Sequence, residues 1–103
     1  MRLTDLHAEF VAAGGAGISD ADGRPVPPRS GIGVVFDCPC GCDSRCYIPF
    51  ANPIDGGPPR EDGWLRTGST IDGLTLRPSI LRNPAKGGCG WHGFVTEGEV
   101  RDV

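Results

Sequence analysis

The chain has 103 residues, of which 17 are Gly and 10 are Pro, and only 7% of them are aromatic. A single domain of this size buries only about two-thirds of the surface of its unfolded chain, so we expect an additional cross-link to support a small core. The formal charge of -3, with dispersed Lys and Arg, argues against nucleic acid as a partner, because phosphate binding needs a concentrated basic face.

The N-terminal segment carries charges and lacks the apolar run of a secretory signal. No stretch approaches the roughly 20 apolar residues that a membrane span requires. We therefore expect a cytoplasmic protein with reduced cysteines and no membrane contact.

The first 30 residues are predicted to form a short helix followed by an arm rich in Pro and Gly. Thr4 is a suitable N-cap, Leu6 and Phe10 have helical spacing, and Gly14 is a suitable end, which predicts a helix over residues 5–13. Residues 14–30 are dominated by turn formers and are predicted to be loop.

Residues 31–103 are predicted to form the metal-binding β core. The segment 31–37 is β-branched and aromatic, and 46–50 is its return strand, so four cysteines lie at the tip of a hairpin. A long loop is expected over 51–63. The remaining predicted strands are 64–65, 74–81, 93–96 and 99–103, with a turn-rich loop over 83–90. The expected fold is mainly β: a short N-terminal helix, then a metal-stapled antiparallel β domain of Rieske-like or zinc-ribbon-like form.

The cysteines are the main chemical signal in the sequence. Cys89 and His92 have C-x-x-H spacing, which allows one turn to supply two ligands to one ion. From the first cluster we favour Cys38 and Cys40, because Cys38 follows the strand directly and one Pro stiffens the link; Cys42 is the alternate ligand. The predicted set is therefore Cys38, Cys40, Cys89 and His92.

Zinc is the metal expected at such a site, with iron or an iron-sulfur cluster as the alternative. The remaining thiol of the first cluster, Cys46, is expected to lie outside the site. Buried or surface thiols without a metal are the simplest competing interpretation.

Three segments resemble a family of small phage and bacterial proteins of unknown function that are often labelled ammonia monooxygenase. These are Cys38-Pro-Cys-Gly-Cys, Leu74-Thr-Leu-Arg-Pro-Ser-Ile-Leu and Cys89-Gly-Trp-His-Gly-Phe-Val-Thr-Glu-Gly-Glu-Val. The resemblance spans roughly residues 34–102 and implies a zinc site without an established reaction. For a phage-encoded protein, it implies the host-cell cytoplasm.

A weaker resemblance is to the Rieske proteins. The segment Cys89-Gly-Trp-His-Gly-Phe is similar to their second ligand box, but Cys40 stands where their first box has a histidine. A two-His Rieske cluster therefore cannot be assembled from these two loops. The other histidine, His7, is expected to be a surface or packing residue.

Four protein ligands close a zinc site and leave no position for water, so the sequence favours a structural metal over catalysis. No Ser-His-acid pattern, phosphate-binding Gly loop or H-E-x-x-H motif is evident. We expect a module that binds a host or phage protein. The alternative is a small metalloprotein with redox activity, through a Rieske-like iron-sulfur cluster, or with hydrolytic activity.

Overall fold

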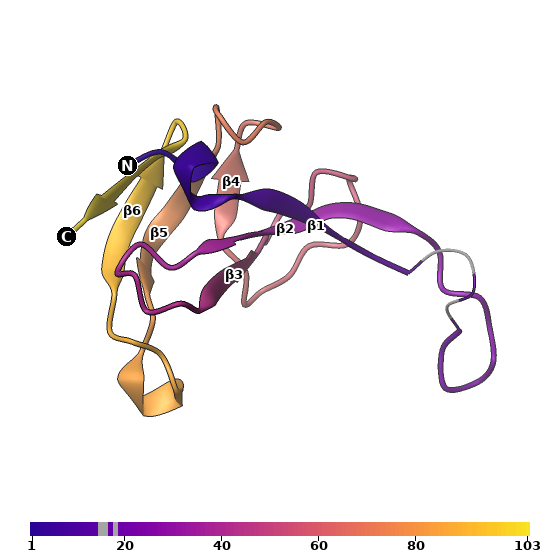
Figure 1. Cartoon of the computed structure of the whole chain (residues 1–103). Helices are drawn as coiled ribbons and strands as arrows, with labels where there is room; N and C mark the ends of the chain where they lie inside the picture. The colour runs from indigo at the N-terminus through magenta and orange to yellow at the C-terminus, as the bar shows by residue number, and fades with distance from the viewer. Residues whose placement is uncertain (15–16, 18) are drawn as a thin grey trace.

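The computed structural model describes residues 1–14, 17 and 19–103 of the chain (Figure 1). The mainly β fold predicted from the sequence is confirmed. In the described part, the elements are η1 (Leu3–Leu6), β1 (Glu9–Ala13), β2 (Arg29–Asp37), β3 (Arg45–Pro49), β4 (Leu65–Thr67), β5 (Thr75–Leu81), η2 (Pro84–Lys86), β6 (His92–Thr96) and β7 (Glu99–Asp102).

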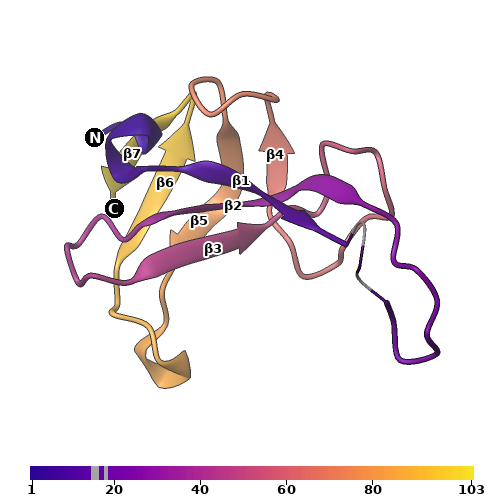
Figure 2. The same ribbon diagram turned by 45° about the vertical axis from the view of Figure 1, so that its right-hand side comes forward.

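The strands form two antiparallel sheets with the orders β1-β2-β3 and β4-β5-β6-β7. Figure 2 shows the first sheet crossing in front of the second, so that one face of each is turned toward the other. Each sheet can therefore bury one set of alternating side chains and expose the other.

The core lies between the two facing surfaces. Along β2, Val34 and Phe36 are fully buried, and on β5 Ile80 is 1% exposed. The whole buried cluster consists of Leu3, Leu6, Val34, Phe36, Cys38, Cys46, Ile48, Phe50, Leu74, Leu76, Ile80, Trp91, Val95 and Val100. Because both sheets and the N-terminal turn contribute to it, neither sheet has a separate core.

Strand β4 joins the two sheets. Trp64, just before β4, donates its main-chain N–H to the carbonyl of Pro49 at 2.8 Å, and Ala51 donates to the carbonyl of Trp64 at 2.8 Å. This places Trp64 beside the end of β3, so β4 pairs with β5 only through residues 65–67. The C-terminal half of β5 is therefore not covered by β4.

The N-terminal segment differs from the sequence prediction in one respect. The short helix is a single 3-10 turn, Leu3–Leu6, and residues 9–13, which we assigned to the second half of that helix, form β1. Phe10 pairs with Val34 in register and packs edge-on against Phe50 with the ring centroids 6.2 Å apart. Pairing with an existing strand outweighs the weak local preference for a helix.

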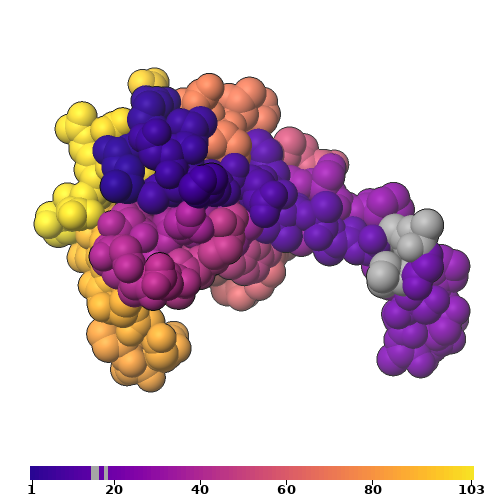
Figure 3. Space-filling view, in the orientation of Figure 1, coloured from indigo at the N-terminus to yellow at the C-terminus, as the bar shows by residue number. Residues whose placement is uncertain are grey.

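The N-terminus is fixed to the C-terminal hairpin. Leu3 donates its N–H to the carbonyl of Gly98 at 2.9 Å, and Val100 donates to the carbonyl of Met1 at 2.6 Å. The Arg2 guanidinium donates to the carbonyl of Asp72 at 3.2 Å. In Figure 3 these first residues, in indigo, lie between the yellow C-terminal hairpin and the orange turn before β5.

The long segment between β1 and β2 was predicted to be loop over residues 14–30. Residues 15, 16 and 18 of that loop lie outside the described residues. An isolated bridge joins Ser19 to Pro25, and β2 begins at Arg29, two residues earlier than predicted. Figure 1 shows the described part of this segment extending away from the two sheets. The proposed division at residue 30 stays a prediction.

Within the described residues, we find no helix with the length and apolar character needed to cross a bilayer.

Two phenylalanine substitutions should differ strongly in their effect on the free energy of unfolding. Phe36→Ala removes a fully buried ring and should lower the free energy of unfolding by about 3–5 kcal/mol in urea denaturation. Phe94→Ala is the matched control, because that ring is 48% exposed, and it should change the free energy by about 0.5 kcal/mol or less. Equal losses of unfolding free energy for the two variants would contradict a core that lies between the two sheets and includes Phe36 but not Phe94.

A second prediction concerns the ion pair that fastens loop 51–63 to the start of β2. The Arg29 guanidinium binds both carboxylate oxygens of Asp55, at 2.9 and 3.1 Å, and lowers the Asp55 pKa from 3.8 to about 2. Because the folded-state pKa is depressed, this stabilisation is present above about pH 4 and is lost as the pH falls toward 2. Asp55→Asn should therefore destabilise the protein at pH 6 and have little effect at pH 2.

The control for this pH series is Glu61→Gln, which changes an exposed carboxylate of the same loop that makes no ion pair with the described residues. Its effect on the free energy of unfolding should be small at both pH values. A penalty for Asp55→Asn that is the same at pH 2 and pH 6 would show that the loss is not due to the charge.

Candidate functional site

The cysteine-rich turn between β2 and β3 is a tight hairpin tip. Cys38 donates its N–H to the carbonyl of Ser44 at 2.9 Å, and Gly41 donates to the carbonyl of Cys38 at 3.0 Å. Gly41 has φ +80°, a conformation that residues with a side chain seldom adopt. The chain therefore folds back on itself and brings Cys40 next to Cys38.

Cys89 reaches the same place from the loop between β5 and β6. The Asn83 side chain accepts a hydrogen bond from Ala85 N–H at 2.9 Å and caps η2, the short turn that begins this loop. Gly90 then donates to the carbonyl of Arg82 at 2.7 Å, and Gly88 lies so close to the Arg82 main chain that a Cβ atom would collide with it. The loop is thereby folded back onto the end of β5.

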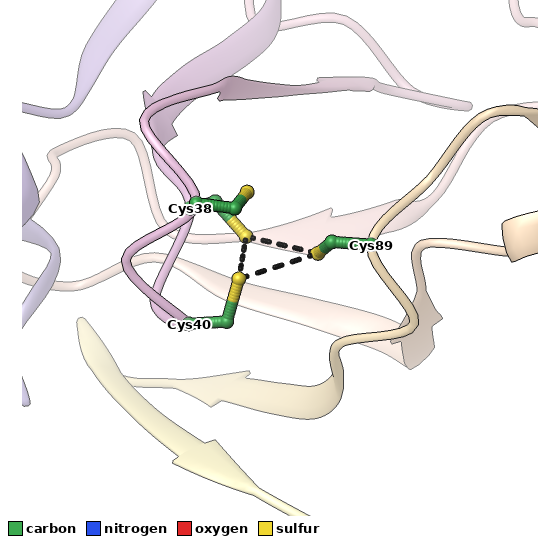
Figure 4. A group of neighbouring side chains, drawn as sticks. Cys38, Cys40 and Cys89 are labelled. Atoms are coloured by element: carbon green, nitrogen blue, oxygen red, sulfur yellow. Dashed lines mark hydrogen bonds between the residues drawn. The ribbon is translucent and has the colours of Figure 1, made fainter.

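The thiols of Cys38, Cys40 and Cys89 form a triangle (Figure 4). The Sγ atoms of Cys38 and Cys40 are 3.3 Å apart, and each lies 3.4 Å from the Sγ of Cys89. The Sγ atom of Cys42 also belongs to the group, in which all four sulfurs lie within 4.8 Å of one another. Four sulfurs at such distances can surround one tetrahedral metal ion.

The electrostatics of the four thiols also suit a cation. Hydrogen bonding to the Ser44 hydroxyl lowers the pKa of Cys42 to about 6, whereas the hydrogen bond with Cys38 raises the pKa of Cys40 to about 12. Neighbouring thiolates repel one another, so the ionisation of one thiol disfavours that of the next. A bound divalent cation would supply the positive charge that allows all four to deprotonate.

The fifth cysteine has a different environment. Cys46 is 3% exposed, and burial raises its pKa to about 11. Its side chain belongs to the core between the two sheets and is not part of the four-sulfur group. It is therefore a packing residue, and its burial favours the neutral thiol.

His92 does not point into the cysteine cluster. Its Nε2 atom lies 3.0 Å from the Oγ atom of Ser79, on the neighbouring strand. Leu81 on β5 is directly opposite His92 on β6, and side chains two residues apart lie on the same face. Ser79 is thus the diagonal neighbour of His92, within the region where the β5–β6 register shifts.

The Ser79–His92 pair has no third, acidic member in the described part of the chain. The hydrogen bond to Ser79 is the one that the His92 ring makes with the described residues. His7 pairs with Asp37 at 2.8 Å instead, at a site where the imidazole is 81% exposed. The arrangement is a Ser-His dyad in which Nε2 can accept the hydroxyl proton.

Ser79 opens onto a groove on the outer face of the second sheet. The groove has a volume of about 780 Å³, and its walls include Leu65 from β4 and Phe94 from β6, which are 60% and 48% exposed. Loop 51–63 contributes Ala51 and Gly63 to the opposite wall. The hydroxyl thus faces a surface that can hold an apolar chain.

The residues predicted from the sequence to bind a metal can be located in the structure. It predicted that Cys38, Cys40 and Cys89 would meet, and the structure brings these three together with the alternate, Cys42. It also assigned His92 to the metal, where the structure has that residue bonded to Ser79. The geometry favours Cys42 as fourth ligand, and the ligand set itself stays a prediction.

Ser79 was not singled out from the sequence at all, and we found no Ser-His-acid pattern there. Ser79 and His92 are thirteen positions apart, so only the pairing of β5 with β6 brings them together. The available signal was the segment Arg77-Pro78-Ser79, which places a hydroxyl in the predicted strand 74–81, while the next predicted strand starts one residue after His92.

Comparison with known families gives one match. The model of the family described as "Bacterial ubiquitination-like system serine protease (BubE)" matches residues 22–103. Neither the curated proteins nor the solved structures that were searched include a match.

This match overturns the function that we expected from the sequence. The family description indicates a protease-related role, so the expectation of a phage-type protein with a structural zinc that acts as an interaction module is wrong. The comparison gives no support to a phage origin, to the family labelled ammonia monooxygenase or to the Rieske resemblance. A ubiquitination-like system does imply protein partners, as expected.

The matched segment covers most of the chain and includes β2–β7, all the cysteines, Ser79 and His92. The chain therefore belongs to the BubE family of bacterial ubiquitination-like system serine proteases.

Proposed function

We propose that this protein is a serine protease in which Ser79 is the nucleophile and His92 the general base. Its substrate is a protein of a bacterial ubiquitination-like system, in which it cleaves an amide or ester bond. The observation that carries this proposal is the 3.0 Å contact between Ser79 Oγ and His92 Nε2 in a member of that family. A serine hydroxyl is a weak nucleophile and needs an adjacent base of this kind.

In the first half of the reaction, Ser79 Oγ attacks the carbonyl carbon of the scissile bond while its proton passes to His92 Nε2. The resulting tetrahedral intermediate collapses when the bond to the leaving group breaks. His92 returns the proton to the departing amine or alcohol, and the acyl group remains as an ester on Ser79.

In the second half, water takes the place of the leaving group. His92 accepts a proton from the water as its oxygen attacks the ester carbonyl, and a second tetrahedral intermediate forms. When the ester bond breaks, the proton returns to Ser79 Oγ and the carboxylic acid is released. The cycle needs no redox partner and restores both residues.

We further propose that the cysteine cluster binds zinc through Cys38, Cys40, Cys42 and Cys89. The cluster offers four sulfur ligands, which is a donor set that zinc binds in closed, four-coordinate sites. With four thiolates no coordination position remains for substrate, so the catalytic steps fall to Ser79 and His92. The zinc would fix the loop between β5 and β6, in which Cys89 lies three residues before His92.

A reducing cytoplasm is the compartment that we propose, because all five cysteines have free thiols and the proposed zinc site needs them reduced.

The catalytic proposal predicts covalent labelling of one serine. A small fluorophosphonate should label the wild-type protein at Ser79, as read by peptide mass mapping, and Ser79→Ala should abolish the reaction. His92→Ala should slow labelling by about 10²-fold or more, because the hydroxyl loses its base.

Ser69→Ala is the matched control for this experiment. Ser69 is an exposed serine in the turn before β5, and its removal should leave the labelling rate unchanged. Equal labelling of Ser79→Ala and wild type would refute the assignment of the nucleophile.

The zinc proposal predicts the metal content of a set of variants measured by elemental analysis. Wild type should hold about one zinc per chain, and Cys89→Ser and Cys42→Ser should lose it. His92→Ala should keep its zinc although it labels slowly, and Cys46→Ala is the control outside the cluster. Loss of zinc in His92→Ala together with full zinc in Cys42→Ser would instead support the ligand set predicted from the sequence.

A further inference from the structure

The free edge of β5 lies next to the proposed nucleophile. Arg82, the residue after β5, donates its N–H to the carbonyl of Trp91 at 2.8 Å and accepts from Gly90 N–H at 2.7 Å, so its main chain faces the β6 side. In an antiparallel sheet, main-chain polar groups of successive residues point to opposite edges. The N–H and C=O of Leu81 therefore point away from β6, toward the edge of β5 where β4 no longer pairs with it.

The outer edge of β3 carries a second set of such groups. Phe50 donates its N–H to the carbonyl of Ile32 at 2.9 Å, which fixes the alternation along the β2–β3 ladder. The main chain of Ile48 then faces β2, and that of Tyr47 faces outward. Pro49 follows the same rule, because its carbonyl accepts the Trp64 N–H on the outer side.

A groove of about 440 Å³ separates these two edges. Its walls include Tyr47 and Ile48 on one side and Ile80 and Leu81 on the other, with Trp64 at the wall contributed by the chain that leads into β4. Leu81 is 52% exposed and Tyr47 is 45% exposed. In the described part of the chain, the main-chain groups of Leu81 and Tyr47 that face this groove have no hydrogen-bond partner.

The other edges of the sheet that carries Ser79 are partly occupied. At β4, the Asn52 side chain takes both outer groups of Arg66: its Oδ1 accepts the N–H at 2.9 Å and its Nδ2 donates to the carbonyl at 3.0 Å. At β7, the N–H of Val100 is bonded to Met1. On the strand that carries Ser79, and among the described residues, the open pairing position is thus at the end of β5.

The position of Leu81 relative to Ser79 suits a substrate chain. The Ser79 carbonyl, which points to the same edge, is already bonded to the Trp64 indole N–H at 3.4 Å, so Leu81 is the next available residue. Residues along a strand are about 3.3 Å apart, so a peptide residue paired with Leu81 lies two residues from the one that is level with Ser79, beside the Trp64 indole.

We propose that the substrate binds as an added β-strand at the free edge of β5, in the groove between β3 and β5. Its residue two positions before the scissile carbonyl exchanges main-chain hydrogen bonds with Leu81. The occupant is an extended polypeptide segment, because one N–H and one C=O at strand spacing are the complement of a peptide backbone. This inference rests on the proposed function and specifies how that site holds its substrate.

The segment of the substrate that ends in the scissile carbonyl is the part that must be held at the edge of β5. It stays attached to Ser79 through the second half of the reaction, whereas the leaving group departs after the first. Main-chain pairing at Leu81 would keep the ester carbonyl beside His92 until water attacks.

The test compares two reagents that both react with an activated serine. One is the small fluorophosphonate, and the other is acetyl-tetraalanine diphenylphosphonate, in which the phosphorus replaces the scissile carbonyl. N-methylation of the residue that pairs with Leu81 should slow inactivation by the peptide reagent about three- to tenfold, the effect of one hydrogen bond. N-methylation of the next residue, whose N–H points away from β5, should change it less than twofold.

Two variants supply the matching change on the protein. Leu81→Pro removes the N–H that faces the groove and should slow the peptide reagent by a similar factor without changing the rate of the small fluorophosphonate. Leu81→Ala keeps the N–H and should leave both rates nearly unchanged. In addition, hydrogen exchange at the Leu81 amide should slow in the peptide adduct and stay fast in the fluorophosphonate adduct.

The outcomes separate this inference from the proposed function. If neither reagent labels Ser79, the catalytic assignment fails. If both label Ser79 but N-methylation has no position-dependent effect and the Leu81 amide stays unprotected, the protease assignment stands and strand addition at β5 is refuted. Protection confined to residues around Leu65 and Phe94 would place the substrate in the groove on the outer face instead.

Discussion

The contact between the cysteine turn and the loop before β6 is the constraint on which the rest of the site depends. It joins a hairpin tip of the first sheet to a loop of the second, through sulfur atoms 3.3–3.4 Å apart. A chain of 103 residues has a small core, so a contact between two segments that are distant in the sequence is important for positioning both of them. Cys89 is three residues before His92, so the same contact determines where β6 begins.

The Ser79–His92 pair and the open edge of β5 have a common origin. Trp64 bonds to the end of β3, and this draws the chain away from β5 before the strand reaches Ser79. Ser79 is then flanked by β6 on one side, which supplies His92, and by the Trp64 indole on the other, and the groove between β3 and β5 begins at Ile80 and Leu81. One departure from regular sheet pairing thus accounts for both the exposed main chain and the accessible hydroxyl.

Much of the fold follows from local patterns, because hairpins are encoded in short stretches of sequence. The cysteine hairpin and the C-terminal hairpin around Gly98 are of this kind. The strand over residues 9–13 is different, since its pairing with β2 lies across a long arm and outweighs its own helical spacing. The contact of Ser79 with His92 depends on a register shift between β5 and β6, which no local pattern reports. The C-x-x-H spacing suits a metal loop equally well, and so the sequence analysis assigned His92 to the metal and did not predict its contact with Ser79.

Since the described residues supply no acidic partner for the Ser79–His92 pair, the position of His92 must be fixed in another way. Asp102 is the carboxylate at the end of β7, but it accepts the Trp91 indole N–H at 2.7 Å. Trp91 packs against Gly93 so closely that a Cβ atom there would collide with its ring, and the His92 carbonyl accepts the N–H of Val103 at 3.0 Å. The residues on both sides of His92 are therefore held by the main chain and by a buried indole. Asp102 contributes through Trp91, by fixing the strand that carries the base, and a dyad on such a rigid strand needs no carboxylate to position the imidazole.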